Sequence, residues 1–269
     1  MLEIFREFFG FGGYERTPEG YMSWQHIVFT LVFIGAMVAL AIVIGLKFRN
    51  KDEKQKNKVM IITAIWIVSV EVFRITICCI KEQSFRTILY NLPLFLCSIQ
   101  FITIPLAAWA KGKVKEAALD FVFIFGILSA TMGIIGAGQN FNAYPVISFE
   151  NITSAITHTT AGFASLYVVI SKMQSMKVKN MWITYAILFV VCIVAYIVDI
   201  LIPYNYMFLM RGDGTPYDIF YNMVNGSKIL YPMIVVGLFV LYITAFYLIY
   251  FAIDKAIHRQ KPATQNIEE

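Results

Sequence analysis

Seven long apolar stretches run through this chain of 269 residues, and they constrain its fold more than any other feature. A bilayer core of about 30 Å is crossed by about 20 apolar residues in a helix. The stretches are continuous instead of alternating over about 10 residues, which argues against membrane strands. We therefore predict an all-α polytopic membrane protein with seven transmembrane helices. They cover residues 25–47, 59–80, 87–109, 117–137, 150–171, 181–202 and 229–253.

The composition excludes the other common classes of protein. Hydrophobic residues make up 59% and charged residues 14%, whereas an ordinary soluble protein has roughly 25% charged residues. A soluble fold has too little interior to bury so much apolar surface. Four cysteines are too few for a disulfide scaffold and lack the spacing of a zinc site. The net charge of +5 is spread over short loops and indicates no nucleic-acid partner. Nothing in the sequence indicates a metal or a cofactor.

The distribution of positive charge predicts the orientation. Of the 22 Lys and Arg residues, fifteen fall in loops 1–2, 3–4 and 5–6 and the C-terminal tail, six fall on the other side, and Arg74 lies inside a span. The positive-inside rule then puts the N-terminus outside and the C-terminus in the cytoplasm. We expect an extracytoplasmic segment over 1–24, a transmembrane domain over 25–253 and a polar cytoplasmic tail over 254–269.

Two spans carry ionisable or nucleophilic groups that need an explanation. An ionisable group in hydrocarbon costs roughly 2.5–3.5 kcal/mol on insertion scales. Glu71 and Arg74 are three residues apart on one helical face, so they can pair, and a structural ion pair is the simpler interpretation. Cys97 follows Pro93, which tends to kink the helix, and Gln100 follows Cys97.

The fifth stretch places His158 on a face of small and polar residues. Such a face is also typical of simple helix packing. However, Cys97 and His158 both lie about 12–15 Å below the predicted outer surface. Glu71 lies at a similar depth, and Asp199 and His26 lie near the outer ends of their spans. This common depth predicts one shared cavity in the outer half of the bundle.

The residues of this predicted cavity indicate thiol chemistry. A thiolate is a nucleophile, and a neutral imidazole beside a thiol can take its proton. A carboxylate could orient the imidazole, with Glu71 and Asp199 as candidates. The outer loop 203–228 holds Asn205 and Tyr206 among other aromatic residues. It is either a lid over the cavity or an ordinary interfacial loop.

The chain resembles the YwaF-type integral membrane proteins of bacteria, from about Trp24 to Tyr250. The resemblance rests on Leu92-Pro93-Leu94-x-Leu96-Cys97, on the His158 segment, on Asn205-Tyr206-Met207-Phe208-Leu209 and on His26. It implies a bacterial plasma-membrane location and a distant similarity to a vertebrate membrane protein proposed to transfer acyl chains between phospholipids. By that resemblance Cys97 accepts the acyl chain and His158 is the general base. The family commonly has His two residues before the Cys, where this chain has Phe95.

Three functions are therefore open. The leading hypothesis is lipid acyl transfer or acyl hydrolysis, with membrane lipids as partners and Arg74 or Asn205 holding a phosphate or an oxyanion. The second is a transporter or binding protein with a solute or proton site at Glu71, Arg74, His158 and Asp199. The third is a non-enzymatic assembly or sensor protein. Residues expected to orient the catalytic pair or to bind substrate are Glu71, Arg74, Gln100, Asp199, Asn205, Tyr206 and His26.

Overall fold

The computed structural model describes residues 2–173 and 176–259, and its secondary structure there is entirely helical. Five helices are long and apolar enough to cross a membrane, which agrees with the predicted all-α membrane class. The five are Trp24–Phe48, Glu53–Glu82, Gly112–Ala143, Val178–Leu201 and Leu230–Ala256. A shorter apolar helix covers Gln100–Trp109.

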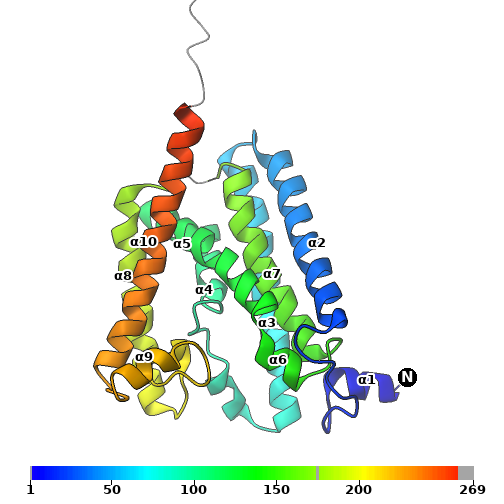
Figure 1. Ribbon diagram of the computed structural model, residues 1–269. Coiled ribbons are helices and arrows are strands. Elements are labelled where there is room, and N and C mark those ends of the chain that lie inside the picture. Colours follow the sequence, from blue (N-terminus) through cyan, green and yellow to red (C-terminus); the bar gives the residue numbers. More distant parts are fainter. Residues whose placement is uncertain (1, 174–175, 260–269) are drawn as a thin grey trace, which may run out of the picture.

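The elements follow one another along the chain as a series of long helices joined by short helical turns (Figure 1). In chain order they are α1 (Leu2–Phe9), α2 (Trp24–Phe48), α3 (Glu53–Glu82), the 3-10 helix η1 (Phe85–Tyr90), α4 (Gln100–Trp109), α5 (Gly112–Ala130), the π-helix η2 (Thr131–Ile135), α6 (Gly138–Ala143), α7 (Phe149–Ile170), α8 (Val178–Leu201), the 3-10 helix η3 (Tyr206–Phe208), α9 (Asp218–Met223) and α10 (Leu230–Arg259).

The third predicted transmembrane helix differs most from the observed structure. Residues 87–109 do not form a continuous helix, because only Gln100–Trp109 is α-helical and the chain before it is a 3-10 turn and an irregular segment. Pro93 cannot donate a backbone hydrogen bond, and polar side chains satisfy the irregular backbone instead. At the other end of the chain, α10 runs past residue 253 to Arg259, and the rest of the predicted tail, 260–269, lies outside the described residues.

Helix α7 lies at the centre of the bundle, against α2, α3 and α5 (Figure 1). Its 22 residues would extend about 33 Å. Many Ser, Thr and Asn side chains lower its hydropathy, and it is not among the five apolar spans. Small residues let α5 and α7 approach closely. At this contact the Ser165 hydroxyl on α7 donates to the carbonyl of Phe123 on α5 at 2.7 Å.

Helices α8 and α10 pack together on the opposite side of the bundle from α2 (Figure 1). A buried polar network joins them to α5. The Asn180 amide and the Tyr247 hydroxyl donate to the Asp120 carboxylate at 3.0 and 3.1 Å. These bonds satisfy a carboxylate that has no exposed surface.

The N-terminal segment braces the connection between η2 and α7. The Glu19 carboxylate accepts from the backbone N–H of Val146 at 2.7 Å, and Arg16 donates to the carbonyl of Ile147 at 2.9 Å. The Tyr21 hydroxyl donates to the carbonyl of Ile135 at 2.8 Å. We refer below to this end of the bundle as the α1 end.

The close contact of α5 with α7 at Gly126 can be tested by adding one methyl group. A Cβ on residue 126 would lie 2.5 Å from the Ala161 carbonyl oxygen and 2.7 Å from the Ser165 Cβ. We expect Gly126→Ala to lower the free energy of unfolding by about 1–3 kcal/mol, as overpacking does. Thermal unfolding in detergent micelles would measure this.

The control is Gly35→Ala in α2, where nothing lies within 4 Å of the added Cβ. Because alanine favours a helix over glycine by about 0.5–1 kcal/mol, this variant should be as stable as the wild type or more so. Equal unfolding temperatures for the two variants would contradict the close α5–α7 contact.

Candidate functional site

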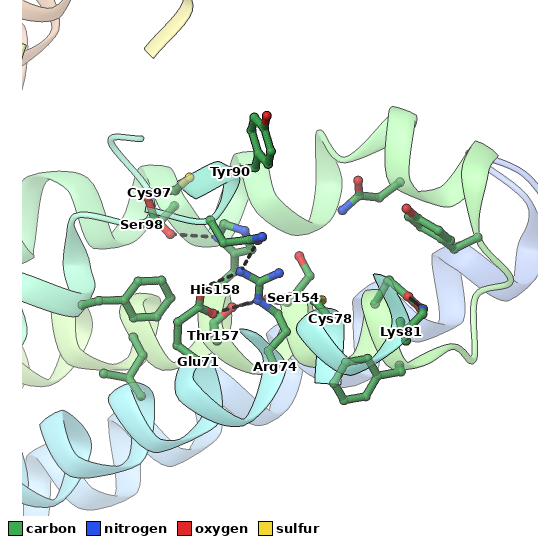
Figure 2. Close-up of a pocket in the computed structure, with 18 of the residues that line it drawn as sticks. Glu71, Arg74, Cys78, Lys81, Tyr90, Cys97, Ser98, Ser154, Thr157 and His158 are labelled. Atoms are coloured by element: carbon green, nitrogen blue, oxygen red, sulfur yellow. Dashed lines mark hydrogen bonds and ion pairs between the residues drawn. The ribbon is translucent and has the colours of Figure 1, made fainter. Parts of the chain in front are cut away.

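A cavity of about 620 Å³ lies between α3, α5, α7 and the segment around residues 90–101. Cys97 and His158 both line it, and so do Glu71 and Arg74. These residues come from three separate parts of the chain. The side chains of Cys97, Ser98, His158, Glu71 and Arg74 gather at one end of the cavity, and Lys81 lies toward the other end (Figure 2). We refer to the first as the thiol end and to the second as the Lys81 end.

Cys97 stands on the irregular segment just before α4. Two hydrogen bonds of Ser98 close a tight turn here, because its hydroxyl accepts from the Phe95 N–H at 3.0 Å and donates to the Phe95 carbonyl at 3.2 Å. The backbone N–H groups of Cys97 and Ser98 face the Cys97 sulfur. The thiol is therefore held on the turn that leads directly into α4.

His158 is held by α5 and the π-helix that follows it. The Ser129 hydroxyl lies 2.9 Å from Nδ1, and the backbone carbonyl of Ser129 also faces the imidazole. Either ring nitrogen of a neutral imidazole can carry the proton, and the nitrogen without it can act as a base.

The π-helix makes room for this imidazole at Gly133. A Cβ on residue 133 would overlap the ring atoms Cγ, Nδ1 and Cδ2 of His158. Short π-helical turns often occur at functional sites because they displace the backbone locally. Here the π-helix places Gly133, which has no side chain, against the His158 ring.

Arg74 links α3 to the segment that carries Cys97. Its guanidinium donates to both oxygens of Glu71, at 2.9 and 2.6 Å, and to the Asn91 side-chain oxygen at 2.9 Å. The Asn91 amide in turn donates to the Thr87 carbonyl at 2.8 Å. The predicted Glu71–Arg74 pair is therefore present. Arg74 also binds Asn91, a partner outside α3 that the spacing of residues along α3 could not indicate.

At the Lys81 end, Glu150 is shared by two partners. It accepts hydrogen bonds from the ammonium of Lys81 and from the hydroxyl of Tyr14. The Lys81 ammonium also lies 5.5 Å from the centre of the Tyr14 ring. Burial, and then the bond to Glu150, raise the pKa of the Tyr14 hydroxyl above its usual range, so it remains a neutral donor. This group connects the N-terminal segment to the cavity wall.

Two predicted site residues, His26 and Gln100, do not line the cavity. The His26 Nδ1 accepts from the Met22 N–H at 3.1 Å, and its Nε2 lies 3.3 Å from the carbonyl of Ile134. This histidine therefore fixes the start of α2 against the π-helix. The Gln100 side-chain oxygen accepts from the Thr103 hydroxyl in the interior of α4. Common depth had placed His26 in the shared cavity, but its side chain lies outside the lining because depth along a helix does not determine the face.

The three predicted residues around the outer loop are also absent from the cavity lining. Asp199 accepts from the backbone N–H of Tyr206 at 2.8 Å, and the Asn205 oxygen accepts from the Met210 N–H at 2.9 Å. The Tyr206 hydroxyl donates to the Leu89 carbonyl at 2.6 Å and accepts from the Leu92 N–H at 3.1 Å. These residues shape the loop and anchor the Cys97 segment to it. The loop residue that lines the cavity is Tyr204.

Several cavity residues were missed from the sequence. Ser129 is one Ser in an apolar helix, and its role depends on a contact with a different helix. Lys81 and Glu150 both fall at the ends of predicted spans, where charged residues are expected in any case. Cys78 also lines the cavity and was not singled out from the sequence. The polar face of α7 was the available signal, since Ser154 and Thr157 line the cavity with His158.

The chain was compared with protein families, curated proteins and solved structures. The model of the TMEM164 family, a membrane protein family, matches residues 21–252. No curated protein and no solved structure matches. The family match covers the long helices from α2 to α8, most of α10 and every residue that lines the cavity.

The Glu71–Arg74 pair should contribute strongly to stability. The side chains of Arg74 and Glu71 are 24% and 11% exposed, so Glu71→Gln would leave a mostly buried guanidinium without its carboxylate. Loss of one partner of a buried pair costs about 3–5 kcal/mol. Thermal unfolding in detergent micelles would show the loss, and Glu71→Gln combined with Arg74→Gln should recover part of it.

The matched control is Glu15→Gln, which removes the carboxylate from an ion pair whose side chains are 60% and 82% exposed. Exposed pairs contribute about 0–1 kcal/mol. A loss in Glu71→Gln no larger than in this control would show that Arg74 does not depend on the pair.

Proposed function

Since this chain belongs to the TMEM164 family of membrane proteins, we propose that it is a membrane enzyme of lipid acyl transfer or acyl hydrolysis. The observation that carries this proposal is the presence of Cys97 and His158 in one cavity, from segments far apart in the chain. Cys97 is the nucleophile and His158 is the general base. The YwaF-type resemblance supports the same two roles.

In the proposed first step, the imidazole of His158 takes the proton of the Cys97 thiol. The sulfur attacks an ester carbonyl, and a C–S bond forms while the ester C–O bond breaks. His158 returns its proton to the leaving alcohol. In the second step a lipid hydroxyl attacks the thioester for transfer, or water attacks it for hydrolysis. His158 takes the proton of the attacking group, and the thiol is regenerated.

Two groups can stabilise the charge that develops on the carbonyl oxygen. The backbone N–H groups of Cys97 and Ser98 lie next to the proposed nucleophile, and we propose them as donors to this oxygen. Arg74 is fixed by Glu71 and Asn91 in the same cavity and can bind a lipid phosphate. Asn205 holds the outer loop and is not part of this proposal.

We propose that the bundle crosses the membrane seven times, with the N-terminus outside. Beyond the five apolar helices, α7 is long enough to cross, and the segment from η1 to α4 completes the seven. Non-helical backbone is tolerated at membrane depth where it is buried in protein or lines a cavity. The excess of Lys and Arg on one side supports the orientation, and the YwaF-type resemblance supports a bacterial plasma membrane.

Acyl transfer should depend on Cys97 alone among the four cysteines. With phosphatidylcholine carrying a labelled acyl chain as donor and a lysophospholipid as acceptor, we expect Cys97→Ala to abolish both labelled product and released fatty acid. His158→Gln should lower the rate at least 100-fold, within the usual contribution of general acid–base catalysis. Mass spectrometry of the intact wild-type protein should detect a thioester-linked acyl chain.

The matched control for this assay is Cys79→Ala, since Cys79 neighbours Cys78 but does not line the cavity. It should retain the wild-type rate. Full activity of Cys97→Ala at an equal protein level would exclude the mechanism. Loss of activity in every variant together with loss of folding would instead indicate a purely structural role.

Gly133 should matter for the rate through the position of His158. Gly133→Ala introduces a Cβ that overlaps the imidazole, so the ring must move. We expect kcat to fall at least 10-fold with little change in KM, and the pH dependence of kcat to shift with the displaced base. The control, Gly138→Ala, places its Cβ at an ordinary distance of 3.4 Å from Tyr21. An unchanged pH profile in Gly133→Ala would remove His158 as the base.

A further inference from the structure

A second concave surface lies between α8 and α10 and shares no lining residue with the cavity. These two helices lie on the opposite side of the bundle from α2 (Figure 1). It is an apolar groove of about 610 Å³. Cys192 and Leu209, which are 4% and 1% exposed, line its buried part. Ile193 and Met233, which are 59% and 65% exposed, line its outer part. The groove therefore opens to the membrane.

The length of the groove matches one leaflet. Its lining runs from Ile229, just before α10, to Val240 within α10, which is about 17 Å at about 1.5 Å per residue. Half of a hydrocarbon core of about 30 Å is about 15 Å. The groove begins at the α1 end of the bundle, where α10 starts, and reaches about the middle of the membrane.

A lysine lines the groove where it begins. Lys228 lies just before α10, and the Tyr196 hydroxyl donates to its carbonyl at 2.9 Å, which fixes the turn. Its side chain is exposed and forms no ion pair with residues in 2–173 or 176–259. A cation at the level of the headgroups attracts the phosphate of an anionic lipid.

The shape of the groove favours an acyl chain over a transmembrane helix. Helices that pack in membranes meet at small residues, which let their backbones approach. Here the lining is bulky, with Phe189, Ile193 and Met233, and the small residue is Gly237. Nothing lies within 4 Å of a Cβ built on Gly237. A flexible chain can enter between large side chains where a second helix cannot.

We propose that this groove binds an anionic phospholipid, with one acyl chain between α8 and α10 and the phosphate at Lys228. This site is separate from the acyl-transfer cavity and does not depend on the proposed activity.

Native mass spectrometry of the purified full-length protein tests this site. The probes are palmitoyl-oleoyl phosphatidylglycerol and the corresponding phosphatidylcholine, added at equal concentration. We expect the wild type to retain one phosphatidylglycerol. Gly237→Phe fills the groove and should lower the bound fraction of both lipids at least 10-fold. Lys228→Gln should lower the preference for phosphatidylglycerol about 5-fold while chain binding persists.

The control is Val190→Phe, which adds the same ring to a membrane-facing position of α8 that is 61% exposed and outside the groove. It should bind lipid as the wild type does. If Gly237→Phe unfolds, Met233→Trp on the outer part of the groove replaces it. Equal lipid binding by the groove variants and the control would overturn the proposal. Wild-type dimers that dissociate in Gly237→Phe would also overturn it, since the groove would then bind a second copy.

Discussion

Backbone groups that leave helical geometry in a buried part of a protein need hydrogen-bond partners from the protein itself, and the candidate site depends on this constraint. The segment before α4 is irregular and contains Pro93, which has no N–H to donate. Its partners come from side chains, with the Ser98 hydroxyl bound to Phe95 and the Tyr206 hydroxyl bound to Leu89 and Leu92. Tyr206 of the outer loop therefore supports the geometry of the Cys97 segment, although Tyr206 itself does not line the cavity.

The segment that carries Cys97 is also fixed by a charged residue of α3. Arg74 binds Asn91 as well as Glu71, so one guanidinium joins α3 to the chain that carries the thiol. His158 is positioned by contacts with α5 and η2, through Ser129 and Gly133. The two proposed reacting groups are thus held by different supports, and their common cavity results from how α3, α4, α5 and α7 pack.

Apolar length was enough to predict six of the seven helical stretches, although α3 begins and α10 ends six residues outside the predicted bounds. Common depth also predicted that Cys97, His158 and Glu71 would line one cavity, because rise per residue converts sequence position into height. Depth does not give direction around the helix, and so His26 and Asp199 were wrongly included. Their partners, Ile134 and Tyr206, come from elements that no spacing within their own helices reveals. The supporting role of Ser129 was missed for the same reason.

The packing of Phe95 says more about the role of position 95 than the YwaF-type sequence pattern does. The YwaF-type pattern has His there, and a second imidazole two residues before the thiol would suggest a shared role in catalysis. The Phe95 ring instead packs against Tyr204, Tyr206 and Phe208, with ring centres 5.2 to 6.3 Å apart, and does not line the cavity. A side chain at this position meets the outer loop and lies away from the cavity. The proposed chemistry therefore assigns no role to position 95 and places the base on α7, at His158.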